Sequence, residues 1–412
     1  MTETLAPSRY ALAFVFITML IDTIGLGVTI PVAPKLIQSL TDTDLSTAAR
    51  YGSWLFFSYA LMQFLFAPVI GNLSDRFGRR PVLILSLTML GIDYVITGLA
   101  PTIGWLFIGR ILSGMSGAAY STANAYIADV SPPEKRAARF GLIGAAFGVG
   151  FVLGPALGGI IGEHFGPRAP FLVAAGLAFA NALFGFFVLR ESLPPERRRP
   201  FDLRRANPLG SVMQVRRYPL LLPLIVVMVL MRLGHDSNPA VWSYYTMLKF
   251  NWSEGQVGLS LAAIGICVSI VYGGFTRIVV PRFGERGAIY MGTLSAAVGF
   301  AGYAFATSGW QLYAFMLPFA MMGLVGPSLN AIMSKNVPAN EQGELQGTLA
   351  SVGSLTSVVA PLIMANLFAY FTAPGAPVHF PGAAFLAASL CMLLAAFLFS
   401  LSSAGRRVLA PA

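Results

Sequence analysis

The chain has few of the residues that soluble domains, disulfide frameworks and metal sites require. Only 11% of its 412 residues are charged, against about 25% in a typical soluble domain. It has two cysteines, and its three histidines lack the spacing of a helical metal site. It has no Gly-x-Ser-x-Gly or His-Glu-x-x-His motif, and none of its four lysines follows a glycine. These absences argue against an enzyme, a bound metal or cofactor, and a phosphate loop for ATP.

Long apolar runs dominate the chain instead. Hydrophobic residues make up 56% of it, and a membrane-spanning helix needs about 20 apolar residues. The sequence therefore predicts an all-α membrane protein with twelve transmembrane helices in two six-helix bundles. The first run is too long for a removable signal peptide and lacks its small-residue cleavage site, so we expect no cleavage. The runs have the approximate limits 10–31, 51–73, 82–100, 103–129, 137–162, 169–189, 219–248, 255–280, 287–307, 309–333, 344–371 and 383–403.

The net charge of +10 is spread along the chain and forms no patch for nucleic acid. With the N-terminus in the cytoplasm, 21 Lys and Arg residues fall on that side of the membrane and four on the other. This asymmetry follows the positive-inside rule. We therefore expect a multi-pass protein of the cell's inner (plasma) membrane, with both termini cytoplasmic and no nucleic-acid partner.

A weak repeat divides the chain into two halves. The charged segment 71–81 recurs at 282–286, an offset of 206 residues, and Gly117 and Gly323 keep the same offset. We predict an N-terminal bundle at 1–189, a cytoplasmic linker at 190–218 and a C-terminal bundle at 219–412. Two related bundles that rock around a central path are typical of secondary transporters. The arginines of the linker are interpreted as a solvated connection or, alternatively, as contacts to anionic lipid headgroups.

The segment 71–81 is a charged turn between two apolar runs. Its glycines allow a tight turn and close helix approach, and Asp75 is placed to cap the next segment or to pair with an arginine between the halves. Our hypothesis is a latch that holds one conformation. The alternative is that the arginines only anchor the topology. The latch candidates are Asp75, Arg76, Arg79 and Arg80.

Closely spaced glycines mark one face of the fifth run. Small residues at this spacing let two helix backbones approach each other, and a proline among them adds a kink. The hypothesis is a seal against the other half that opens during gating, and the alternative is tight packing alone. The residues are Gly150, Gly154, Pro155, Gly158 and Gly159.

Five charged residues lie well inside the apolar runs, more than three residues from either end, where each costs several kcal/mol unless it has a partner or faces a cavity. Asp22 and Asp93 lie near the middle of their runs and are placed to load a proton, and Arg110 would tune a nearby carboxylate. The alternative for these three is a buried ion pair between helices. The other two, Arg232 and Asp236, are i, i+4 neighbours that either neutralise each other or contact substrate.

Further candidates for a substrate site are polar and aromatic residues within the runs. A large, mostly apolar cavity with a few polar anchors would suit an amphipathic molecule, although each of these residues taken alone is more often a packing residue. The substrate-binding candidates are Gln63, Asn124, Arg232, His235, Asp236, Asn238, Trp242, Tyr245 and Asn330.

Three of these features resemble a known family. The turn 71–81 is similar to the signature of the major facilitator superfamily, and Asp22 to Pro34 and Gly150 to Gly159 are similar to motifs of its drug/proton antiporters. Further runs, such as Gly109 to Gly114, resemble the tetracycline-resistance type of efflux pump. The resemblance implies a major facilitator fold and a proton-coupling role for Arg110. It also shows a departure, because the acidic residue and the histidine of those pumps correspond to Ala296 and Val268.

The function expected from these observations is proton-coupled export of amphipathic small molecules, possibly tetracycline-like, by alternating access. The expected partners are the small-molecule substrate, protons and membrane lipid, with the protein as a monomer. The first alternative is a facilitator or a proton symporter of a small metabolite. The remote alternative is a membrane receptor or membrane-embedded enzyme that transports nothing.

Overall fold

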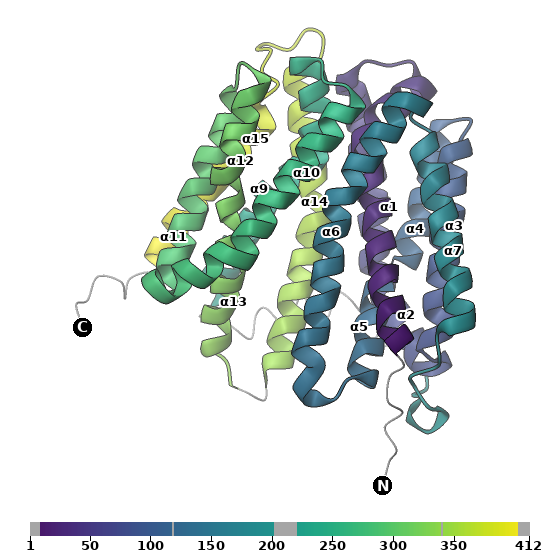
Figure 1. The fold of residues 1–412 in the computed structure, drawn as a ribbon. Helices are drawn as coiled ribbons and strands as arrows, with labels where there is room; N and C mark the ends of the chain where they lie inside the picture. Colours follow the sequence, from purple (N-terminus) through teal and green to yellow (C-terminus); the bar gives the residue numbers. More distant parts are fainter. Residues whose placement is uncertain (1–8, 118, 202–220, 339–340, 403–412) are drawn as a thin grey trace, which may run out of the picture. The chain divides into compact units, whose positions relative to one another are not determined.

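The computed structural model describes residues 9–117, 119–201, 221–338 and 341–402, and within these ranges it contains helices and no strand (Figure 1). The predicted linker continues through 202–218, which lie outside the described residues, as do both termini. The helices are α1 (Arg9–Thr41), α2 (Leu45–Phe77), α3 (Arg79–Leu99), α4 (Ile103–Ser116), α5 (Ala119–Val130), α6 (Pro133–Phe165), α7 (Ala169–Val188), η1 (Pro195–Arg197), α9 (Leu222–Phe250), α10 (Glu254–Ile270), η4 (Val271–Phe275), α11 (Thr276–Phe305), α12 (Gly309–Ala320), η5 (Met321–Leu324), α13 (Val325–Lys335), α14 (Gln342–Thr372) and α15 (Ala383–Leu401).

Within these ranges, nine helical stretches are long and apolar enough to cross a membrane. One of them, Glu254–Phe305, contains two of the predicted runs, which meet at a non-helical Gly284 with φ 67° and ψ 174°. The run 103–129 is divided between α4 and α5, and the run 219–248 forms α9. The prediction of an all-α membrane protein is confirmed, and the described helices are consistent with twelve spans.

The chain divides into two compact units. The first consists of the described parts of Met1–Asp42, Ser58–Pro208 and Ser253–Ala262, and the second of those of Thr43–Phe57, Leu209–Trp252 and Ala263–Ala412. The two predicted bundles, 1–189 and 219–412, stay a prediction.

In the first unit, α1 packs along α6, and α3 packs along α7 (Figure 1). The core between them is formed by wholly buried side chains such as Phe14 and Met19 of α1, Leu83 of α3 and Tyr126 of α5. A buried hydrogen bond from Asn181 Nδ2 to Thr18 Oγ1, 3.1 Å long, joins α7 to α1. In hydrocarbon, such a bond satisfies polar groups that water cannot reach.

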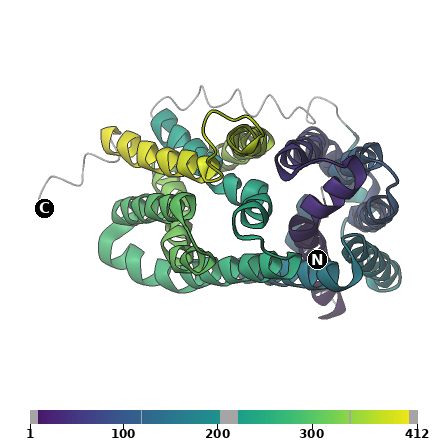
Figure 2. The ribbon, with the colours of Figure 1, turned by 90° about the horizontal axis from the view of Figure 1, so that it is seen from above.

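In the second unit, α11 packs against α15 and α12, and α9 packs against α14 and α15. Seen from above, the yellow α15 lies beside the green α11 (Figure 2). The core is aromatic: the Trp242 and Tyr303 rings are 5.0 Å apart, and those of Tyr245 and Phe385 are 4.9 Å apart, both with their edges towards each other's faces. Each such pair contributes about 0.5–1.5 kcal/mol beyond the burial of its area.

Large apolar side chains also cover the outside of several helices. Phe187 at the end of α7 is 75% exposed and Trp310 at the start of α12 is 70% exposed. In water this surface would drive aggregation, whereas lipid tails cover it without cost. The exposed apolar surface and the apolar core together are what a helix bundle needs inside a bilayer.

The short connection before α2 ends in a cap. The Asp44 carboxylate accepts hydrogen bonds from Thr47 N, at 3.3 Å, and from the Ser46 hydroxyl. Burial raises the pKa of the Asp44 carboxyl, but the hydrogen bonds from Ser46 and Thr47 outweigh it and bring its pKa below the usual value. The charged form of Asp44 therefore stabilises the start of α2.

We expect Asp44→Ala to lower the free energy of unfolding by about 1 kcal/mol, the usual value of an N-cap. Because the pKa of Asp44 is lower in the folded state, its charge stabilises the protein fully above the unfolded pKa of about 3.9 and less as pH falls through the folded pKa. Thermal unfolding of the purified protein at several pH values measures this. Asp44→Asn, which keeps the cap and lacks the charge, is the control, and an Asp44→Ala variant as stable as the parent at pH 7 would rule out the cap.

Candidate functional site

Among the residues of the first unit whose burial is described, Asp93 in the middle of α3 is the most deeply buried charge. Its side chain is wholly buried, and its Oδ2 accepts a hydrogen bond of 2.8 Å from Arg110 Nη2 of α4. Thr97 Oγ1, one turn further along α3, donates to Oδ1 at 3.3 Å. Gly109 leaves the space for this carboxylate, because a Cβ at Gly109 would lie 2.5 Å from Asp93 Oδ1. The structure thus brings together two of the three predicted proton-coupling residues.

Asp22, the third, lies on α1 and is half-buried. Among the described residues, its carboxylate has neither a hydrogen-bond partner nor an ion-pair partner. One turn later, Gly25 lets the Tyr94 hydroxyl of α3 approach the α1 backbone, since a Cβ at Gly25 would lie 2.0 Å from that oxygen. Tyr94 follows Asp93 directly, so α3 carries both a buried ion pair and a contact close to Asp22.

A small amide network lies on α2 in the same unit. Gln63 Nε2 donates to the Tyr59 hydroxyl at 3.3 Å and to Gly117 O, at the end of α4, at 3.2 Å. Gln63 therefore joins α2 to α4. Asn124, the other predicted amide of this half, lies partly exposed on α5.

The glycine face of α6 is packed backbone to backbone. A Cβ at Gly154 would lie 2.6 Å from Ile24 O, and one at Gly158 would lie 2.6 Å from Val28 O, both on α1. Gly150 faces Thr23 and Leu20 of α1 in the same way. The partner of three of the predicted glycines is thus α1, and side chains larger than hydrogen would push the two helices apart.

Gly159 faces a different helix. A Cβ there would lie 2.3 Å from Glu254 O, at the first residue of α10, and one at Gly258 would lie 2.2 Å from Pro155 O. Glu254 is buried and forms an ion pair with Lys35 of α1. The start of α10 is therefore part of the first unit. The gating role of Pro155 and the glycines stays a prediction.

In the charged turn 71–81, Arg79 is the centre of a network. Its Nη1 lies 2.6 Å from Asp75 Oδ1 and 2.6 Å from Ser74 Oγ, and its Nε lies 3.2 Å from Asp129 Oδ2 of α5. The Arg79 side chain is only 11% exposed. Asp75 is thus paired within its own turn, and whether it acts as a latch stays a prediction.

The remaining two arginines of the turn have weaker partners. Arg76 lies over the ring of Phe77 at 5.1 Å and is exposed. Arg80 Nη2 donates to Phe186 O of α7 at 2.6 Å. These contacts fit the interpretation of Arg76 as a topology anchor better than a role in a network.

Glu191 completes the turn, and sequence reasoning missed it. Its carboxylate accepts hydrogen bonds from Arg79 N at 2.8 Å and Arg80 N at 3.2 Å, the first amides of α3, and from Ser192 N and Leu193 N. The preceding Gly78, at φ 104°, lets the Glu191 carboxylate come close to its Cα. The only signal in the sequence was an acidic residue at the start of a polar linker.

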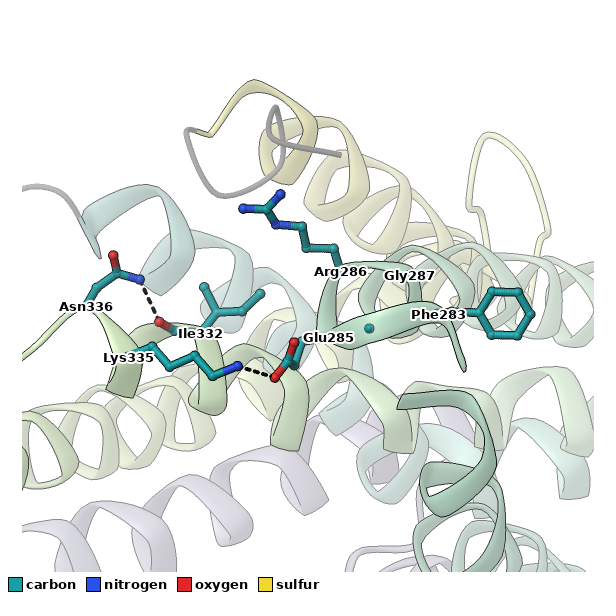
Figure 3. Close-up of a pocket in the computed structure, with 8 residues that line it drawn as sticks. Phe283, Glu285, Arg286, Gly287, Ile332, Lys335 and Asn336 are labelled. Carbon is teal, nitrogen blue, oxygen red and sulfur yellow. Dashed lines mark hydrogen bonds and ion pairs between the residues drawn. The ribbon is translucent and has the colours of Figure 1, made fainter. Parts of the chain in front are cut away.

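The counterpart of this turn in the second unit is shown in Figure 3. Glu285 Oε1 lies 2.5 Å from Lys335 Nζ, at the end of α13. Glu285 lies 206 residues after Arg79, and Lys335 lies 206 residues after Asp129. The repeat therefore keeps an ion pair at the same two positions in both units and reverses the signs of its charges. Lys335 is 67% exposed, so this second pair is worth little, about 0–1 kcal/mol.

The predicted cluster in α9 is arranged differently from a simple i, i+4 pair. Asp236 Oδ1 bonds to His235 Nδ1 at 2.9 Å, and Asp236 Oδ2 is buried without a partner among the described residues. Arg232 points elsewhere, with its Nη1 3.5 Å from Ser357 Oγ of α14. Asn238 is buried, and its Nδ2 has no partner within the described ranges either.

Arg232 and His235 line a cavity of about 400 Å³ inside the second unit, together with Asn330 of α13. Asn330 bonds to Gln346 of α14 through both side-chain amides, at 2.8 and 3.4 Å. Trp242 and Tyr245 are wholly buried in the aromatic core and do not line this cavity. Of the predicted substrate residues in this half, three therefore share one cavity.

Comparison with known proteins identifies the family of the chain. The model of the Major Facilitator Superfamily matches residues 15–361. The chain belongs to the Major Facilitator Superfamily. It is 42% identical to the tetracycline resistance protein of class C from Escherichia coli, over 88% of this chain and 90% of that protein. It is 38% identical to the class G protein from Vibrio anguillarum, over 84% and 88%.

Among solved structures, the human organic anion transporter MFSD10 (TETRAN) matches with a TM-score of 0.69 at 25% identity, over 95% of this chain and 99% of that chain. Membership of the superfamily makes the chain a multi-pass membrane transporter of small molecules and not an enzyme. The resemblance inferred from the charged turn and the glycine motif is confirmed.

The glycine contacts give a test with a matched control on the same helix. Gly154→Ala places a methyl group against the α1 backbone, whereas no atom lies within 4 Å of a Cβ at Gly144. We expect Gly154→Ala to destabilise the protein by about 1–3 kcal/mol, as overpacking does. Gly144→Ala should leave stability unchanged or raise it by about 0.5–1 kcal/mol. Thermal unfolding in detergent compares them, and equal stability of the two variants would contradict the packing described.

Proposed function

We propose that the chain is a proton-coupled exporter of amphipathic small molecules that works by alternating access. The names of its relatives support a drug as substrate, since the two most similar ones reported above are tetracycline resistance proteins. We propose tetracycline as the first substrate to test. The protein is further proposed to act as a monomer in the inner (plasma) membrane of a bacterium, with lipid around it and both termini in the cytoplasm.

The observation that carries proton coupling is the pair of carboxylates in the first unit. Asp93 is wholly buried against Arg110, and Asp22 is half-buried without a hydrogen-bond or ion-pair partner among the described residues. An unpaired carboxylate within a span costs several kcal/mol, a cost that transporters accept where the residue binds an ion. We propose that Asp22 and Asp93 both serve proton coupling, with Asp22 as the residue that loads the proton and Arg110 as the counter-ion of Asp93.

The second unit has a different set of polar groups. By resemblance, Ala296 corresponds to the acidic residue of tetracycline pumps and Val268 to their histidine. Ala296 is wholly buried, and Val268 lines the cavity. Neither side chain can bind a proton. We propose that His235 and Asp236 of α9 take over the polar role in this unit, since Asp236 Oδ2 is buried without a partner among the described residues.

Inverted membrane vesicles with an imposed pH gradient test the proposal. We expect Asp22→Asn to reduce gradient-driven tetracycline accumulation to background, because the amide has the same shape but carries no proton. Exchange of labelled for unlabelled drug without a gradient should remain.

The control is Asp42→Asn, an exposed aspartate at φ 50°, where asparagine fits equally well. Accumulation by Asp22→Asn at the level of the parent would remove Asp22 from coupling. A parent protein that only equilibrates the drug across the membrane would be a facilitator.

A further inference from the structure

We infer that the cavity of the second unit binds the anionic group of an amphipathic substrate, with Arg232 as its counter-ion. The inference rests on the proposed function for the role of the site, because it names the chemical class of molecule that the exporter would hold there. It concerns residues that belong to one unit only.

The charge of the cavity favours an anion. None of the described residues that line it carries a carboxylate. Arg232 is exposed, and its one hydrogen-bond partner within the described residues is the neutral Ser357 hydroxyl at 3.5 Å. The nearest acid along α9, Asp236, is 8% exposed, bonds to His235 and does not line the cavity. A guanidinium without a carboxylate partner is a ready site for a planar carboxylate or enolate, which it binds through two parallel hydrogen bonds.

Two further polar side chains, His235 and Tyr272, line the cavity with Arg232. The Nδ1 atom of His235 bonds to the Asp236 carboxylate, so Nε2 is the ring nitrogen left for a ligand, and it donates to an anion only in the protonated ring. Tyr272 comes from the π-helical turn η4, a kind of turn that is frequent at functional sites. Its ring is accommodated by Gly323, where a Cβ would lie 3.1 Å from the ring. Asn330 and Gln346, by contrast, satisfy each other.

The rest of the wall suits an apolar body. Four methionines, Met228, Met231, Met322 and Met333, line the cavity with Phe319. Methionine side chains are flexible and polarisable, so they adapt to ligands of different shape. A volume of about 400 Å³ lies within the range of small-molecule sites. One charged anchor and an adaptable wall together fit an amphipathic anion and disfavour a cation.

Binding to the purified full-length protein in neutral nanodiscs tests this without any gradient. The probe is 2-naphthoxyacetate, an aromatic carboxylate, and its neutral primary amide is the matched control ligand. Isothermal titration calorimetry should show that the parent prefers the carboxylate. Arg232→Gln should weaken carboxylate binding by about ten- to a hundredfold, the usual loss of a hydrogen bond to a charged group. It should change amide binding by less than about twofold, within the range of surface effects.

Two further variants make the result specific. Arg232→Lys keeps the charge and should restore part of the preference for the carboxylate. Arg277→Gln removes an exposed arginine of the same unit that does not line the cavity, and it should bind as the parent does. Thermal unfolding of each variant confirms that it is folded.

Equal binding of carboxylate and amide by the parent, or carboxylate binding that Arg232→Gln leaves unchanged, would overturn the inference. Failure of the proposed function is a separate result: the carboxylate then binds through Arg232, but vesicles export no drug in response to a pH gradient. If vesicles export tetracycline but Arg232→Gln leaves carboxylate binding unchanged, the proposed function stands and only the anion site is ruled out.

Discussion

The interior of a helix bundle in a membrane offers no water to a charged side chain, and this constraint accounts for most of what the structure shows. Asp93 is wholly buried and pairs with Arg110, and Thr97 satisfies its second oxygen. Even so, a buried ion pair is weak evidence for stability, because the loss of hydration offsets the attraction between the charges. In a chain with only 11% charged residues, the pair therefore supports the proposed coupling role.

The same constraint explains the contrast between the units. In the first unit α1, which carries Asp22, touches α6 backbone to backbone at the glycines of α6. In the second unit the core is filled by aromatic rings, and a cavity with methionine walls remains beside α9. This contrast supports the proposed roles, with proton coupling in the first unit and a ligand site in the second.

The sequence predicted the membrane class and the helical runs, and it identified the charged residues within those runs, because each of these follows from local composition. It also predicted that 71–81 and 282–286 correspond, but it did not show that Arg79 and Asp129 are matched by Glu285 and Lys335 with opposite signs. That finding needs contacts between residues 50 positions apart, which no local pattern encodes. Trp242 and Tyr245 were candidates for a substrate site because they are amphipathic, whereas the structure places them in the core. An aromatic residue within an apolar run gives the same sequence pattern whether it packs in the core or lines a substrate site.

The pairing within α9 shows the same limit. The i, i+4 spacing of Arg232 and Asp236 suggested that they neutralise each other, but Asp236 bonds to its neighbour His235 and Arg232 lines a cavity. Spacing on a helix determines which residues are neighbours, while the packing of α9 against α14 and α15 decides which way each side chain turns. Only the assembled unit contains that information.

The central claim is that the Asp93–Arg110 pair serves coupling and not only the fold. Its most direct test is substrate-driven proton movement in proteoliposomes that contain a pH-sensitive dye, measured for Asp93→Asn, Arg110→Gln and the double variant. The double variant leaves no unpaired buried charge, so it should be folded as stably as the parent, within about 1 kcal/mol, and yet move no protons with substrate. A double variant that restores proton movement to the level of the parent would show that the pair is structural and would contradict the account.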